Sequence, residues 1–345
     1  MLDELPSDPR AIASVARQQT IHHNLLPHLG VPRDLWPSLP RARPPRLDAV
    51  LQALAQTEPH TLSVARRPDQ RVVSACVLES YFLAGLLRRR GHRVRVRVGY
   101  FQNIRGNAEH VVAFWEQVMR EKGVEAELLE RDPDQWHETV NAYSRRQNAV
   151  DHHIEHWICE FWDEREQCWR LLDANDEFLR AHSGLEVDFF LSPEYFEYAH
   201  EGWLRVRSGH CDPDQYREDE QDGRSHARSQ LLWDFASLLN HDASGIHDPG
   251  GRDYAFIKRQ TYAQTAEAEL HALDELAALL ADGRIDELAD FYYATPTLRI
   301  EGAEHDQHSL VFNASGRSEA SADDDLARAS SLGLDANTHA PRSWN

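Results

Sequence analysis

The chain has 345 residues, 41% of them apolar, and a formal charge of −20 at pH 7. This length suits one large domain with extensions, or two domains. The negative charge argues against binding to nucleic acid or to anionic lipid, because like charges repel. No stretch of eighteen apolar residues occurs, so we expect no membrane-spanning helix.

The first residues, MLDELPSDPR, are acidic and do not form the basic and apolar pattern of a secretory signal. We therefore expect a cytoplasmic protein. In that compartment the four cysteines, Cys76, Cys159, Cys168 and Cys211, should be free thiols.

The N-terminal part, residues 1–60, is predicted to be a helical extension. Its pattern indicates a helix over 8–26, with Pro9 near the start, and a second helix over about 46–57. A proline-rich connector over 32–45 separates the two helices.

The most apolar helix of the chain is predicted over 74–90. Almost no polar face remains on it, which is typical of a buried helix, and Gly91 fits a left-handed cap. A strand over 93–100 follows, with alternating arginine and valine. The arginines could form a phosphate-binding patch, but the strict alternation favours a strand with its valines inward and Arg93, Arg95 and Arg97 facing solvent.

Residues 107–149 look helical and polar, and we assign 101–150 as an insertion in a core that spans 61–200. Apolar residues at helical spacing predict helices over 227–241 and 261–283, within a helical region over 201–302. Residues 303–345 contain few large apolar side chains and are predicted to be disordered.

Two aromatic-rich segments, HWICEFW and CWRLLD, flank DEREQ and predict a β-hairpin. If its turn centres on residues 164 and 165, His156 lies directly opposite Asp173, on the same face of the sheet. Alternation along the first strand directs Cys159 to the other face. A thiol that reacts with the help of His156 must therefore come from another element.

Cys76 is the candidate for that thiol, because it stands at the start of the buried helix. The helix dipole and backbone N–H groups there should lower the thiol pKa. A cysteine, a histidine that removes its proton and an aspartate that orients the histidine are the groups that nucleophilic acyl transfer needs. The backbone N–H of Cys76 could be one oxyanion donor.

The segment ACVLESYFLAGLLRRRGHRVRVRVGY resembles the cysteine, helix and strand segment of the transglutaminase-like superfamily. HWICEFWDEREQCWRLLDA resembles the superfamily's histidine and aspartate strands, with His156 and Asp173 at the matching positions. The resemblance covers about 65–175 and implies an α+β fold with a papain-like core, in which the cysteine helix packs on an antiparallel sheet. It also implies a Cys76–His156–Asp173 triad.

The sequence departs from many superfamily members in two ways. Ala75 stands where they have glycine, and 56 residues separate Tyr100 from His156. That insertion could be a lid, a substrate wall or a surface decoration. Glu79, Trp157 and Tyr100 are candidate substrate-binding residues.

We expect an enzyme that forms an acyl-enzyme from an amide or thioester donor, which a carrier protein could present, and passes the acyl group to an amine. Two alternatives remain: a hydrolase with the same triad, and a non-catalytic binding module. His152, His153 and His156 could suggest a metal site, but no H-E-x-x-H, CxxC or calcium-loop pattern occurs. We therefore expect neither a bound metal nor another cofactor. The sequence leaves the oligomeric state open.

Overall fold

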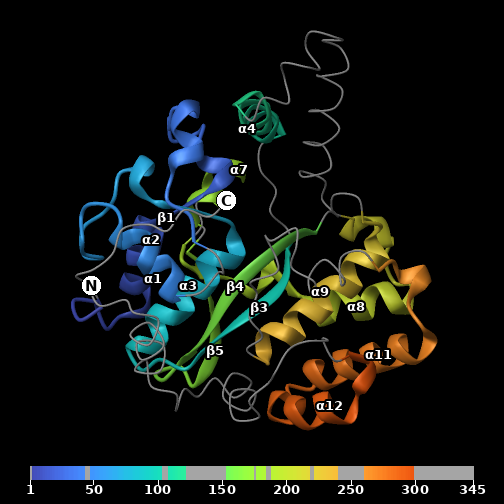
Figure 1. Ribbon diagram of the computed structural model, residues 1–345. Coiled ribbons are helices and arrows are strands. Elements are labelled where there is room, and N and C mark those ends of the chain that lie inside the picture. Colours follow the sequence, from blue (N-terminus) through green and yellow to red (C-terminus); the bar gives the residue numbers. More distant parts are fainter. Residues whose placement is uncertain are drawn as a thin grey trace, which may run out of the picture.

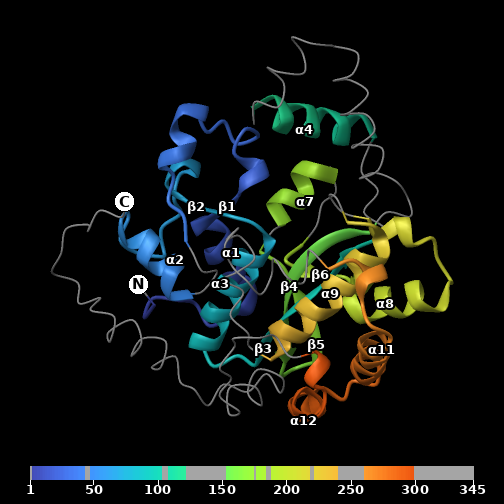
Figure 2. The ribbon, with the colours of Figure 1, turned by 45° about the vertical axis from the view of Figure 1, so that its right-hand side comes forward.

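The computed structural model describes residues 2–42, 47–102, 108–121, 153–174, 176–183, 188–217, 221–239 and 260–298. The fold is α+β, as predicted: helices surround a five-stranded antiparallel sheet (Figures 1 and 2). The predicted disordered tail over 303–345 lies outside these residues. Of the predicted 101–150 insertion, they include only 101–102 and 108–121.

The large sheet has the strand order β6-β5-β4-β3-β7, and β1 and β2 form a separate parallel pair. The strands are β1 (Thr20–His22), β2 (Val72–Ser74), β3 (Val94–Phe101), β4 (Ile154–Asp163), β5 (Cys168–Leu172), β6 (Phe190–Leu191) and β7 (Phe196–Tyr198). The helices are α1 (Pro9–Gln19), α2 (Leu47–Ala55), α3 (Cys76–Arg89), α4 (Ala108–Glu121), α7 (Asp176–Ser183), α8 (Ala199–Ser208), α9 (Gly223–Leu238), α11 (Glu267–Ala281) and α12 (Leu288–Ala294). Short 3₁₀ turns occur between several of these elements.

The predicted buried helix is α3, and both of its ends agree with the sequence pattern. Gly91 has a φ of +80°, and the N–H of His92 returns to the carbonyl of Leu87, which closes the last turn. In the middle of the helix, a Cβ on Gly85 would lie 2.8 Å from the Cβ of Leu47. Glycine at this position therefore allows α2 to pack closely against α3.

The first predicted helix is shorter than the sequence pattern suggests. Helix α1 ends at Gln19, because Thr20–His22 leave the helix and pair as β1 with β2. The pairing sets Thr20 beside Val72 and His22 beside Ser74. Strand β2 leads directly into α3, so this small parallel sheet holds the segment that precedes Cys76.

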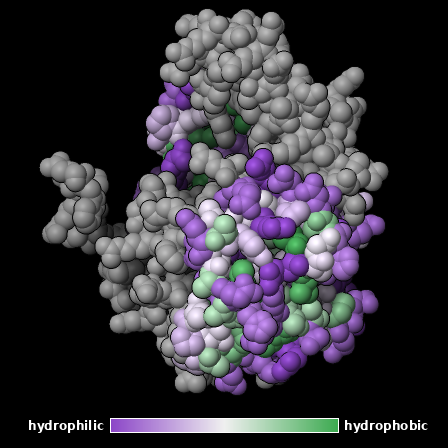
Figure 3. Space-filling model, turned by 90° about the vertical axis from the view of Figure 1, so that its right-hand side faces the viewer, coloured by the Kyte–Doolittle hydropathy of each residue, from purple (hydrophilic) through white to green (hydrophobic). Residues whose placement is uncertain are grey.

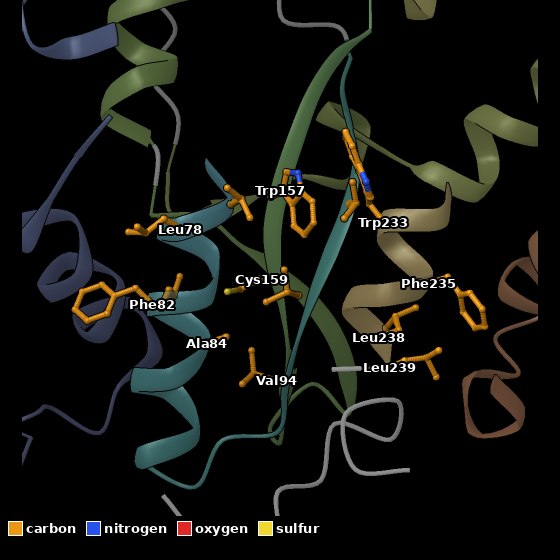
Figure 4. Close-up of a cluster of buried hydrophobic side chains, with 14 of the residues drawn as sticks. Leu78, Phe82, Ala84, Val94, Trp157, Cys159, Trp233, Phe235, Leu238 and Leu239 are labelled. Atoms are coloured by element: carbon orange, nitrogen blue, oxygen red, sulfur yellow. The ribbon is translucent and has the colours of Figure 1, made fainter. Parts of the chain in front are cut away.

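One face of β3 and β4 forms the main core. Val94 and the two valines that follow it in alternation lie opposite Phe161, Cys159 and Trp157 in the register. Figure 4 shows Val94, Trp157 and Cys159 between α3 on one side and α9 on the other. The Cys159 thiol donates to the carbonyl of Ser80 in α3 at 3.0 Å, so Cys159 is a core residue on the α3 side of the sheet.

The other face of the same strands corrects the prediction that Arg95 and Arg97 face solvent. Both are buried, with 7% and 3% of their surface exposed. The cross-strand register sets Arg95 beside Glu160, and both arginines bind the Glu160 carboxylate. Arg97 also binds Asp234 of α9 through two nitrogens, at 3.0 and 2.8 Å. The arginines are inside because these carboxylates balance their charge.

Helix α9 also covers the edge of β3 that β7 leaves open. Strand β7 pairs only with Gly99–Phe101, so the preceding residues of β3 need other partners on that side. The N–H of Val98 donates to Asp234 at 2.8 Å, and the hydroxyl of Ser237 donates to the carbonyl of Val96 at 2.9 Å. These side chains thus supply hydrogen-bond partners to backbone groups of β3 that no neighbouring strand pairs with.

The predicted helices over 227–241 and 261–283 correspond to α9 and α11, and with α8 and α12 they form one side of the molecule (Figure 1). Figure 3 shows that this side carries mainly hydrophilic side chains, with apolar ones in small groups. Leucines of α11 are buried toward the core. Among the described residues, no helix has the length and apolar character needed to cross a membrane.

Candidate active site

Cys76 is the first residue of α3, directly after β2 and Ala75. Ala75 is the N-cap residue and has no side-chain oxygen with which to cap the first turn. The cysteine is half-buried, and the backbone N–H of Trp157 in β4 is hydrogen bonded to its sulfur. The start of α3 and strand β4 therefore meet at this sulfur. The residue of β4 that binds it, Trp157, directly follows His156.

His156 and Asp173 form the predicted contact. The Nε2 atom of the imidazole lies 2.9 Å from Oδ2 of the carboxylate, and both side chains are almost fully buried. Phe101 stacks on the imidazole with 3.7 Å between ring centroids. Because Nε2 faces the carboxylate, Nδ1 is the nitrogen that can exchange a proton with a nucleophile or a substrate.

The register that brings them together differs from the predicted one. Strand β5 pairs Leu172 with Cys159 and Cys168 with Asp163, so the turn contains four residues and centres on 165 and 166. This register sets Asp173 level with Ile158 rather than with His156. The two side chains still share one face, because the change moves Asp173 by two positions along β4.

Among the hydrogen bonds of the described residues, none joins the Cys76 thiol to the His156 imidazole. The sequence pattern of β4 explains the arrangement. His156 lies on the face of Phe101, whereas Trp157 lies on the face that packs against α3. The sulfur is held by the backbone N–H of Trp157, the residue that follows His156.

The pKa of the Cys76 thiol is opposite in direction to the prediction. Burial raises this pKa most, and the carboxylates of Glu155, Glu79 and Asp173 raise it further. The Trp157 N–H opposes the shift and does not overcome it. Burial, and after it the three carboxylates, therefore outweigh the effect expected of the helix start. The resting thiol is therefore protonated at neutral pH.

Glu79, Tyr100 and Trp157, the candidate substrate-binding residues, are all buried. Glu79 is one turn into α3 and accepts a hydrogen bond from Ser74 at 2.7 Å. Burial raises its pKa to about 8. Each residue holds one buried atom without a hydrogen-bond partner among the described residues: Glu79 Oε2, Tyr100 OH and Trp157 Nε1. Glu79 is thus a buried carboxyl group, not a solvated one, although it lies in the first turn of a helix.

Sequence reasoning missed a second histidine and carboxylate pair near the sulfur. Nε2 of His226, in α9, lies 3.1 Å from the carboxylate of Glu155, in β4. Glu155 directly precedes His156, but His226 is 71 residues away in the chain. No local pattern marks His226, so only the packing of α9 against the sheet could reveal the pair.

The described residues contain no cluster of three or more histidine, cysteine, aspartate or glutamate side chains that could hold a metal ion. His153 instead lies 3.0 Å from Glu197 and stacks on Tyr216. His152 is outside the described residues.

Comparison with protein-family models, curated proteins and solved structures gives no match.

Proposed function

We propose that this protein is a cysteine acyltransferase that uses a Cys76–His156–Asp173 triad on a papain-like, transglutaminase-like core. The observation that supports this most is the buried His156–Asp173 hydrogen bond beside a sulfur at a helix start. A carboxylate that holds an imidazole in one tautomer, next to a thiol, is the arrangement that nucleophilic acyl transfer requires.

The first half of the reaction forms the acyl-enzyme. Nδ1 of His156 takes the proton of the Cys76 thiol, and the sulfur attacks the carbonyl carbon of an amide or thioester donor. The developing oxyanion is placed near the backbone N–H of Cys76. The bond to the leaving group breaks, and His156 returns the proton to that group, so that the imidazole is neutral again.

The second half transfers the acyl group to an amine, which forms an amide and releases the enzyme sulfur. Water as acceptor would make the same site a hydrolase. The protonated resting thiol fits a general-base mechanism, in which His156 removes the proton only when a donor is bound. A carrier protein could present the donor.

An activated ester tests the proposal without knowledge of the natural donor. p-Nitrophenyl acetate should release one equivalent of p-nitrophenolate rapidly, followed by slower turnover. Cys76→Ala should abolish the rapid phase, and His156→Ala should slow it about 10²-fold or more. Cys168→Ala, at an exposed thiol in the hairpin, is the matched control and should behave as the wild type.

Product analysis then separates the two enzyme functions. With glycinamide present, mass spectrometry should detect acetylglycinamide from a transferase and only acetate from a hydrolase. A wild type without a rapid phase, or a rapid phase that survives Cys76→Ala, would leave the non-catalytic binding module as the better interpretation.

A further inference from the structure

Ser74 and Glu79 form a buried hydrogen bond on either side of the candidate nucleophile. The hydroxyl of Ser74 donates to Oε1 of Glu79 at 2.7 Å, and the two residues are only 5% and 4% exposed. Ser74 is the last residue of β2, and Glu79 lies in the first turn of α3. Cys76 lies between them in the chain, at the first position of the helix. The bond therefore closes a short loop that contains the cysteine.

The two residues occupy positions that many helices use to fix their N-terminus. Ala75 is the N-cap, so Ser74 directly precedes the cap and Glu79 is the fourth helical residue. In the hydrophobic staple, apolar side chains at these two positions pack together and fix the angle at which the chain enters the helix. Here a hydrogen bond joins a hydroxyl and a carboxyl group at the same positions. We call this bond the polar staple.

The polar staple joins α3 to a residue that is already fixed from the other side. The backbone of Ser74 is paired with His22 of β1, and Nδ1 of His23 lies 3.1 Å from the carbonyl oxygen of Ser74. Ala75 offers no side-chain oxygen to the first turn of the helix. The hydrogen bond between Ser74 and Glu79 thus takes over the task of setting the helix start against the small parallel sheet.

We propose that Ser74 and Glu79 are positioning residues for the Cys76 sulfur. This assignment rests on the proposed acyl-transfer function. The polar staple holds the sulfur at the backbone N–H of Trp157, which follows His156 in β4. A helix start without the staple could change its angle and carry the sulfur away from that N–H. Displacement of a reacting atom by about 1 Å can slow a reaction about 10²-fold, so the staple contributes to the rate of acylation as well as to folding.

The role of the staple depends on position and not on charge. Burial raises the pKa of Glu79 to about 8, so at neutral pH its carboxyl group is mostly uncharged. The group can therefore accept the hydrogen bond of Ser74 without adding a full negative charge near the thiol. An apolar pair at the same two positions should fix the helix start equally well.

The rapid release of p-nitrophenolate from p-nitrophenyl acetate tests the staple. Ser74→Val and Glu79→Leu each leave one partner of the bond buried and alone, and each should slow the rapid phase about 10- to 100-fold without reducing its size. The double variant Ser74→Val/Glu79→Leu replaces the polar staple with an apolar one and should return the rate to within about threefold of the wild type. Glu275→Leu, at an exposed position of α11, is the matched control and should leave the rate unchanged.

Iodoacetamide labelling at pH 8 distinguishes a displaced sulfur from an unfolded protein. In each single variant Cys76 should react faster than in the wild type, because displacement relieves the burial that is the main cause of its raised pKa. Cys159 is fully buried, and its thiol is bonded to the carbonyl of Ser80, so it reacts only when the core opens. Its labelling should stay at the wild-type rate, and the double variant should restore slow labelling of Cys76.

Wild-type acylation rates in both single variants would overturn the assignment. An equal acceleration of labelling at Cys76 and Cys159 would also overturn it, because the variants would then act through loss of the fold. So would a double variant that is no faster than the single ones. If Glu79→Leu does not fold, Ser74→Ala, which removes one oxygen atom, takes its place.

Failure of the acyl-transfer function has a different signature. A wild-type protein without the rapid phase would overturn that function. The labelling of Cys76 against Cys159 needs no acyl donor, so it would still show whether the staple holds the sulfur.

Discussion

The Nε2 atom of His156 lies 2.9 Å from Oδ2 of Asp173, although Asp173 is level with Ile158 in the pairing of β4 and β5. The contact is therefore diagonal across the two strands. Such neighbours remain within reach of each other when they share a face of the sheet. The hairpin can thus differ by one residue in its turn centre and still present the imidazole and the carboxylate to the same space.

Removing the charge of Asp173 should slow acylation of Cys76. Asp173→Asn leaves an amide beside Nε2, which no longer stabilises the imidazolium and can favour the wrong tautomer. We expect the rapid release of p-nitrophenolate to slow about 10²- to 10⁴-fold. Asp290→Asn, on the exposed side of α12, is the matched control. A wild-type rate in Asp173→Asn would show that the pair does not assist the thiol.

The raised pKa of Cys76 predicts slow alkylation of the free enzyme at neutral pH. Burial is the main cause, and only the small thiolate fraction reacts. The rate of iodoacetamide labelling at Cys76 should increase about tenfold for each pH unit from 7 to 9. Peptide mass spectrometry measures this rate, with the exposed Cys168 as an internal reference. Rapid labelling at pH 7 would show that the helix start lowers the pKa of the Cys76 thiol more than burial raises it.

Glu79→Gln should change the pH dependence of stability. Burial raises the pKa of Glu79 to about 8, so the folded protein binds this proton more tightly than the unfolded chain does. Its stabilising contribution is complete below the unfolded pKa of about 4.5 and is lost as pH rises through about 8. Glutamine resembles the protonated acid and keeps an acceptor for Ser74. The Tm of the variant should therefore gain on the wild type between pH 5 and 8 and level off above. A constant difference in Tm across this range would contradict the raised pKa.

Glu160 should be important for stability because it lies between two buried guanidinium groups. Burial alone would raise its pKa, but Arg95 and Arg97 outweigh burial and lower the pKa to about 2. Glu160→Gln leaves Arg95 without its carboxylate and should lower the free energy of unfolding by about 3–5 kcal/mol. Urea unfolding measures this, with the exposed Glu166→Gln expected within about 0.5 kcal/mol of the wild type.

The same residue should contribute to acid unfolding. Because its folded pKa is depressed, its contribution is present above the unfolded pKa of about 4.5 and is lost as pH falls toward about 2. The stability difference between wild type and Glu160→Gln should accordingly shrink over this range. An unchanged difference at pH 3 and pH 7 would indicate that the charge of Glu160 does not matter.

Local patterns predicted several elements well. The apolar run of α3, its end at Gly91 and the alternation in the hairpin each depend on neighbours in the chain, so their positions follow from the sequence. The predicted extension of the first helix to residue 26 was wrong because Thr20–His22 pair with β2, which lies about fifty residues later. Such a partner overrides local propensity and has no local signature.

The arginines of β3 show the same limit. Alternation correctly separated them from the valines of that strand, but it could not tell whether their face meets water or protein. Glu160 is in register with Arg95, so the pairing of β3 with β4 places a carboxylate beside the arginine. Asp234 comes from α9, far along the chain, and completes the balance of charge.

Periodicity and spacing in the chain thus established which side chains share a face and which helix carries Cys76 at its start, because both depend on backbone geometry over a few residues. The tertiary structure decided the charge around the sulfur and the presence of the second pair, Glu155 and His226. Electrostatic effects act through space and depend on burial, so residues that are distant in the chain determine the protonation of a thiol.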